Sequence, residues 1–205
     1  MPEPVTTDVI VLRKTPYGDS RAIITGISPN HGQVGFMVPN PLPGSRSSFP
    51  HLDLFRLVTI SYRPSGGKLH TCQDADLLQD FSALTRTYAS FQAACWLAKF
   101  TLANVLPETA HPHYFHALTI ALGRLAAASV PPVSVLTGAS VAFLFEEGWL
   151  DAVQQSEQVM EQCRQLLLMS AGAPPPRLTP SCWEQLFAWA CQLLAQAECM
   201  VPQSS

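Results

Sequence analysis

The chain has 205 residues, of which 47% are hydrophobic and 13% are charged, and its formal net charge at pH 7 is -3. This composition predicts a globular protein with a well-buried core and excludes a disordered chain. The most apolar stretch, from Phe91 to Phe145, is interrupted by charged residues and prolines, so we expect no membrane-spanning helix. The first residues lack the pattern of an export signal, and we therefore expect a cytoplasmic protein.

Five short segments rich in β-branched and apolar residues come first along the chain, separated by turns of Pro, Gly, Asn and Asp. The expected strands cover residues 9–14, 21–27, 33–38, 54–63 and 69–78. Residues 39–50 are rich in Pro, Gly and Ser, which predicts an irregular loop. The Pro-Ser-Gly-Gly sequence of residues 64–67 predicts a tight hairpin between the last two strands. A small barrel of this size is compatible with an OB-fold, which often binds nucleic-acid strands.

Positive charge is concentrated in this first part of the chain. Residues 9–72 hold seven basic residues against two acidic ones. We interpret these cations as phosphate partners of DNA, the alternative being charges that serve only solubility and strand-edge protection. The candidate DNA-binding residues are Arg13, Lys14, Arg21, Arg46, Arg56, Arg63 and Lys68. Arg63 and Lys68 flank the glycine turn and are expected to project from one hairpin tip.

Aromatic residues of the expected barrel provide a second candidate set. Tyr17, Phe36 and Tyr62 have side chains that can stack on bases, but aromatic residues in a small barrel are more often part of its core. The sequence leaves both alternatives open for each of the three.

The pattern changes from strands to helices after Asp80. Apolar residues then recur at helical spacing, and prolines and Thr-Pro pairs mark the helix starts. The expected helices cover residues 82–106, 111–128, 133–150 and 156–170, followed by a fifth that begins at Thr179. The third is almost entirely apolar and is expected to be central, and Ser181 with Glu184 is an alternative capping box for the fifth. We therefore predict an α+β protein with a barrel domain over residues 1–80 and a helical domain over residues 81–205.

Motifs for catalysis and for metal binding are missing from the sequence. Residues 65–70 lack the Walker spacing, and the adjacent Glu146 and Glu147 point to different sides of a helix. The six cysteines form no C-x-x-C pair and are expected to be reduced core residues. His111, His113 and His116 lack a further ligand at matching spacing, so we expect solvated histidines. We predict no enzymatic activity, no metal and no cofactor.

Three sequence blocks resemble the RecO family of bacterial recombination mediators. They are VIVLRKTPYGDSRAIITGISPNHGQVGFMVP, LFRLVTISYRPSGGKLHTCQDADLL, and HPHYFHALTIALGRLA followed by VAFLFEEGWL. The closing LTPSCWEQLFAWACQLLAQ resembles the last helix of the family. The resemblance implies an N-terminal OB-fold barrel on a helical domain, without enzymatic activity. It also implies a role in DNA repair and recombination through binding of single- and double-stranded DNA and strand annealing.

The resemblance further implies protein partners. Family members associate with RecR to load RecA, and their helical domain receives the acidic, Phe-ended C-terminal tail of single-stranded DNA-binding protein. Such a tail needs an apolar slot beside a cation. The candidate partner-binding residues are Arg86, Lys99 and Arg124. We expect one of the three to flank that slot.

Two departures from the family pattern qualify the DNA-binding prediction. Many relatives carry two C-x-x-C pairs after the block similar to FLFEEGWLD, whereas this chain continues with AVQQSEQ and is expected to fold without zinc. Relatives also carry a Lys-Gly-Ala-Arg-like cluster after the third strand, of which only Arg46 remains here. The alternative function is therefore a degenerate RecO-like interaction protein with little DNA binding.

Overall fold

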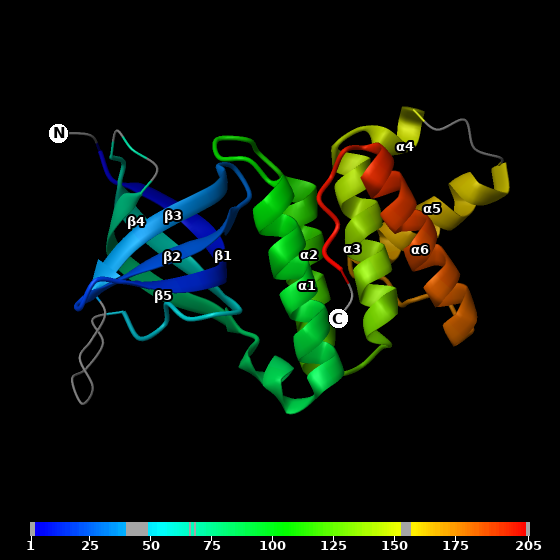
Figure 1. Ribbon diagram of the computed structural model, residues 1–205, viewed down its shortest axis with the longest axis horizontal. Helices are drawn as coiled ribbons and strands as arrows, with labels where there is room; N and C mark the ends of the chain where they lie inside the picture. The colour runs from blue at the N-terminus through cyan, green and yellow to red at the C-terminus, as the bar shows by residue number, and fades with distance from the viewer. Residues whose placement is uncertain (1–2, 40–48, 66, 68, 153–156, 204–205) are drawn as a thin grey trace. The chain divides into compact units, whose positions relative to one another are not determined.

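The computed structural model describes residues 3–39, 49–65, 67, 69–152 and 157–203. The chain divides into two compact units, shown in Figure 1. The barrel unit contains residues 1–82 and 105–111, and the helical unit contains residues 83–104 and 112–205. Among the described residues, no helix is both long enough and apolar enough to cross a membrane.

The barrel unit is a closed five-stranded barrel with the strand order β1-β2-β3-β5-β4. Its strands are β1 (Val5–Tyr17), β2 (Arg21–Ser28), β3 (Gly32–Pro39), β4 (Arg56–Arg63) and β5 (His70–Asp80). Neighbouring strands are antiparallel except β3 and β5, which run parallel where the barrel closes. This arrangement confirms the predicted OB-fold barrel followed by helices.

The barrel core consists of the inward-facing residues of all five strands. Val9, Ile24 and Ile60 are completely buried in it, and the other buried residues of this core are at most 8% exposed. Phe36 and Tyr62 meet edge to face with ring centroids 5.2 Å apart, and both are buried. The structure therefore resolves the aromatic alternatives in favour of the core for these two residues.

Residues 105–111 lie against the turn between β2 and β3 through backbone hydrogen bonds. The N–H of Gln33 donates to the carbonyl of Leu106, at 3.2 Å, and the N–H of Glu108 donates to the carbonyl of His31, at 2.8 Å. Gly32 lies between these bonds with a φ of 60°. A Cβ at Gly32 would come within 2.2 Å of the Leu106 carbonyl oxygen, so only glycine fits this approach.

Among the described residues, a short 3-10 helix leads into the helical unit, which contains six α-helices. These elements are η1 (Ser82–Arg86), α1 (Tyr88–Asn104), α2 (Pro112–Ala127), α3 (Pro132–Glu146), α4 (Trp149–Ala152), α5 (Glu157–Ser170) and α6 (Pro180–Gln196). The predicted helix over residues 82–106 is divided because Thr87 accepts a hydrogen bond from the N–H of Ser90, which starts a new helix. Helix α3 packs against the other five α-helices and is buried on nearly all sides, which confirms its predicted central position.

Polar side chains satisfy several helix ends. Thr179 accepts a hydrogen bond from the N–H of Cys182, so it caps α6 as predicted, rather than the alternative box. The carboxylate of Glu146 accepts from the N–H groups of His113 and Tyr114, at 3.0 and 2.8 Å, and so caps the start of α2. These contacts satisfy backbone donors that the helices themselves leave without a partner.

Two sequence-based predictions about single residue types were wrong in part. All six cysteines are free, but Cys182 is exposed at the first turn of α6 rather than in a core. His113 and His116 are exposed as predicted, whereas His111 is only 3% exposed. His111 is buried because residues 105–111 pack on the barrel, with its N–H donating to the carbonyl of Pro29. In the described part of the chain, no group of His, Cys, Asp or Glu residues could hold a metal ion.

Candidate nucleic-acid interface

The hairpin of β1 and β2 carries a cluster of exposed cations around one exposed aromatic ring. Arg13, Lys14, Tyr17 and Arg21 are all exposed, and the Tyr17 side chain has an exposed fraction of 53%. In this register Arg13 is opposite Thr25 and Tyr17 is opposite Arg21. Because directly opposed residues of an antiparallel pair project to the same face, the hairpin places an aromatic ring beside a guanidinium group.

Three of these side chains share one outward face of the sheet. Residues two apart on a strand project to the same side, so Arg13, Tyr17 and Arg21 lie on one face and Lys14 lies on the other. The guanidinium of Arg21 also contacts the sulfur of Met37 on β3, at 3.3 Å. The shared face thus extends over β1, β2 and β3, and OB-folds commonly bind nucleic-acid strands on the β2–β3 face and the adjoining β1–β2 loop.

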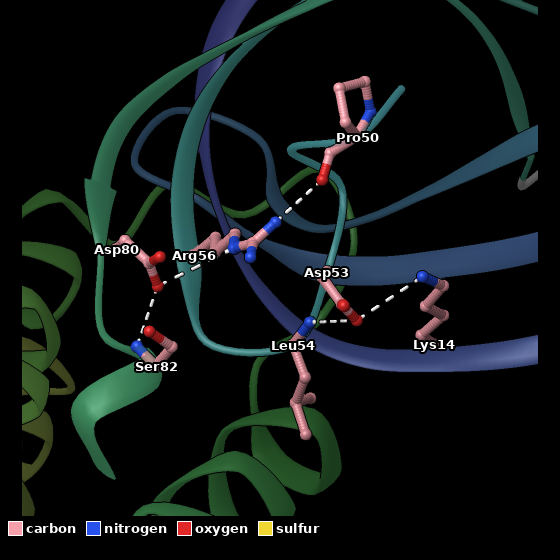
Figure 2. A network of polar contacts seen from close by, with 7 residues as sticks. All are labelled: Lys14, Pro50, Asp53, Leu54, Arg56, Asp80 and Ser82. Atoms are coloured by element: carbon pink, nitrogen blue, oxygen red, sulfur yellow. Dashed lines mark hydrogen bonds and ion pairs between the residues drawn. The ribbon is translucent and has the colours of Figure 1, made fainter. Parts of the chain in front are cut away.

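Lys14 and Arg56 take part in a polar network at the end of the barrel, shown in Figure 2. The Nζ of Lys14 is 3.4 Å from Asp53, whose carboxylate also accepts from the N–H of Leu54. Arg56 donates to the carbonyl of Pro50, at 2.8 Å. Intramolecular partners therefore already engage both cations.

The second partner of Arg56 is Asp80, at 3.7 Å. The N–H of Ser82 donates to the same carboxylate, and this hydrogen bond is the main reason why the pKa of Asp80 is lowered, with Arg56 adding to the effect. The side chain of Arg56 is only 23% exposed. Its present position is suited to joining β4 and the end of β5 more than to contacting a ligand.

The remaining candidate cations of the barrel surround the other loops. Arg63 is exposed at the end of β4. Arg46 and Lys68 lie outside the described residues, as does most of the predicted loop of residues 39–50. Of the hairpin tip predicted to carry Arg63 and Lys68, the structure therefore describes Arg63 but not Lys68. Close to Arg63 in sequence, the N–H of Ser65 donates to the ring of His70.

An acidic row, which was not predicted from the sequence, lies on the outer face of β1, β4 and β5. Asp8 is opposite Thr59, Thr59 is opposite Asp76, and Asp74 is opposite Ser61. Thr59 donates a 2.7 Å hydrogen bond to Asp8. The charge count over residues 9–72 excluded these aspartates, although the alternating Asp-Ala-Asp of residues 74–76 is visible in the sequence. A polyanion is therefore favoured on the β1–β2 hairpin and repelled from this face.

The three candidate cations of the helical unit have different surroundings. Arg86 is exposed at the end of η1. Arg124 donates to the carbonyls of Met169, at 2.8 Å, and Ala173, at 2.5 Å, and so satisfies the end of α5, while burial lowers its pKa. Lys99 is exposed on α1 and lines an apolar groove.

The groove beside Lys99 has a volume of about 350 Å³. Its apolar wall includes Trp96 on α1, Leu136 on α3 and Phe187 on α6. The rings of Trp96 and Phe187 meet edge to face, with centroids 5.4 Å apart. An apolar hollow with one cation at its margin has the composition expected of a slot for an apolar residue that carries or adjoins a negative charge.

The barrel order, the parallel β3–β5 closure and the helical unit that follows define an OB-fold protein with an added helical domain. Residues 1–81 match the model of the family described as recombination protein O N terminal. The match makes the barrel, which carries the exposed cations, similar to the N-terminal domain of that family. No curated protein matches the chain.

Proposed function

We propose that this protein is a RecO-like mediator of DNA repair and recombination that binds single- and double-stranded DNA without reading its sequence. The observation that carries this proposal is the shared outward face of Arg13, Tyr17 and Arg21, on a barrel that matches the RecO N-terminal family model. The protein acts without enzymatic chemistry, in the cytoplasm and at the nucleoid.

The DNA contact is mainly electrostatic. Each phosphate that a cation neutralises releases counterions, and binding weakens as salt rises with a slope of about -0.7 per contact for a single strand. The cluster on the hairpin, with Arg63 and the two cations outside the described residues, supports about three to five such contacts, or a total slope of roughly -2 to -3.5. Tyr17 adds stacking on an unpaired base, which is independent of base identity.

The helical unit provides the protein contacts in this proposal. The groove beside Lys99 receives an acidic peptide ending in Phe, as in the C-terminal tail of single-stranded DNA-binding protein. RecR is the partner with which the protein loads RecA. Support for the peptide contact comes from the position of Lys99 at the edge of an apolar hollow lined by Trp96 and Phe187.

A degenerate RecO-like interaction protein with little DNA binding is the second candidate. Two observations favour it. Lys14 and Arg56 are engaged with Asp53 and Asp80, and an acidic row covers the outer face of β1, β4 and β5. Under this alternative the fold and the groove are retained, while the barrel binds DNA only at very low salt.

A titration of a labelled single-stranded oligonucleotide at two salt concentrations tests the proposal. The double variant R13A/R21A is expected to lower the affinity similarly for all sequences and to flatten the salt slope by about 1.4, because two phosphate contacts are lost. R63A/K68A is expected to flatten the slope by more than about one unit for the same reason. The control is R86A, which removes an exposed cation from the helical unit. An absence of binding by the parent protein at low salt would support the degenerate alternative.

A further inference from the structure

A strap formed by residues 199–203 lies along α1 without regular secondary structure. The side-chain amide of Asn104 donates to the carbonyl of Met200, at 3.0 Å, and its oxygen accepts from the N–H of Met200, at 2.8 Å. Farther along the strap, the indole N–H of Trp96 donates to the carbonyl of Pro202, at 2.9 Å. Because Met200 is bound at the end of α1 and Pro202 near its middle, the strap runs antiparallel to the helix.

These three hydrogen bonds recognise the backbone of the strap and not its side chains. Asn104 pairs with both polar backbone groups of one residue, which is how a neighbouring β-strand would pair with it. The side chain of Met200 is itself 69% exposed. Any extended segment with free backbone groups could therefore make the same bonds, so the strap occupies a site that is not selective for its own sequence.

The strap also reaches the apolar groove of the helical unit. Pro202 and Gln203 line the groove together with Trp96 and Lys99. A peptide that entered the groove and continued along α1 would meet the strap at Trp96. Two extended chains cannot use the same indole N–H and the same Asn104 amide, because each of these groups is already paired with the strap.

We propose that the strap is an internal occupant of a site for extended peptides, and that its release from Asn104 and Trp96 regulates binding of an acidic, Phe-ended peptide in the groove. This inference rests on the proposed function of the groove and adds its regulation. Asn104 and Trp96 then have two alternative partners, the strap of the same chain and the backbone of the incoming peptide.

Competition of this kind has a measurable consequence. When only a fraction of molecules has the strap open, the apparent affinity for the peptide is reduced by that fraction. N104A removes both bonds to Met200 and leaves the residues that line the groove unchanged. Because N104A loses these bonds to the strap and to the peptide alike, its affinity for the peptide is expected to change by less than about twofold. M200P weakens only the strap and is expected to bind the peptide about fivefold to tenfold more tightly.

The first experiment is a fluorescence anisotropy titration with a labelled acidic peptide that ends in Phe with a free carboxylate. Parent protein and N104A are compared, with A103N as the control that places an amide at the adjacent exposed position of α1. M200P is a second variant, which removes the N–H that donates to Asn104 without altering any helix. Tighter binding by M200P, but not by N104A or A103N, supports the proposal, and equal affinities of M200P and the parent protein contradict it.

The second experiment follows the strap directly by nuclear magnetic resonance. Hydrogen exchange is measured for the indole N–H of Trp96, assigned with W96F, and for the amide of Met200. When the peptide saturates the parent protein, the amide of Met200 is expected to lose its protection, whereas the indole N–H of Trp96 stays protected because it then pairs with the peptide. If the peptide binds and the amide of Met200 stays protected, the strap is not displaced and the inference is wrong, while the proposed groove function stands. If neither the parent nor the two variants bind the peptide, both the groove function and its regulation are wrong.

Discussion

The ammonium group of Lys14 lies 3.4 Å from the carboxylate of Asp53 and so links β1 to the segment that precedes β4 (Figure 2). Both side chains are well exposed, so water and salt weaken the pair, which contributes about 0 to 1 kcal/mol to stability. A bound phosphate must compete with this carboxylate for Lys14. Under the proposed function, the ion pair therefore limits DNA binding more than it supports the fold.

The substitution D53N tests this competition. Asparagine keeps the oxygen that accepts from Leu54 but removes the charge that holds Lys14. We expect single-stranded DNA to bind about twofold to fivefold more tightly, with a salt slope steeper by about 0.7, because one more phosphate is neutralised. The measurement is an anisotropy titration at several salt concentrations. D76N on β5 changes the net charge equally and is expected to have the smaller effect; equal effects would contradict a direct role of Lys14.

Tyr17 provides a test that separates stacking from charge. Replacing it with alanine is expected to weaken binding of single-stranded DNA by about 1 to 3 kcal/mol, the usual contribution of one base stacked on an aromatic ring. Binding of double-stranded DNA should change little, because its bases are already stacked. Y88A removes an exposed ring from α1 and is the control. An equal loss for both forms of DNA would show that Tyr17 does not stack on a base.

Gly32 and Gly18 form a matched pair for stability measurements. Both have a positive φ near 60°, but a Cβ at Gly32 would collide with the Leu106 carbonyl, whereas nothing lies within 4 Å of one at Gly18. G18A is expected to lower the free energy of unfolding by about 1 kcal/mol, because of backbone strain alone. G32A should cost at least about 2 kcal/mol more, since residues 105–111 must shift. Chemical denaturation measures both, and equal costs would mean that these residues do not pack on the turn as described.

Glu146 is expected to stabilise α2 through its cap. The variant E146Q loses the negative charge near the positive end of the helix and has only one side-chain oxygen with which to accept from the two N–H groups. We expect the free energy of unfolding to fall by about 1 to 2 kcal/mol. E147Q at the adjacent exposed position is the control and should change stability by less than about 0.5 kcal/mol. A similar loss in both variants would count against the cap.

The pKa of His70 predicts a pH dependence of barrel stability. Burial lowers this pKa, the positive charge of His31 lowers it further, and Glu108 partly opposes both. The folded barrel therefore binds the proton more weakly than the unfolded chain, so stability falls as the pH drops through about 6.5, the usual value for histidine. H70F keeps a ring stacked on Tyr62 and should reduce this dependence between pH 7 and 5. H116Q on α2 should leave it unchanged, and an unchanged dependence in H70F would exclude His70 as its source.

Local patterns were sufficient to predict most of the elements. Alternation of β-branched residues located all five strands, and helical spacing with Thr179 as a cap located the later helices. Such features depend on residues close together in sequence, which is why they can be recognised there. The exposed group of Arg13, Tyr17 and Arg21 is also a local feature, because the three residues lie on either side of a single turn.

Other features depended on pairing between distant segments. Closure of the barrel by β3 with β5 and β1 with β4 was implied only by the family resemblance, since no local pattern specifies which edges meet. The same pairings bring Asp8 and Asp76 into one row and leave Lys14 beside Asp53. The strap on α1 joins residues about a hundred positions apart through Asn104 and Met200. The sequence by itself determined which residues carry charge and approximately where most elements lie. The tertiary structure alone decided which charges are already paired, because electrostatic and hydrogen-bond energies depend on distance in space.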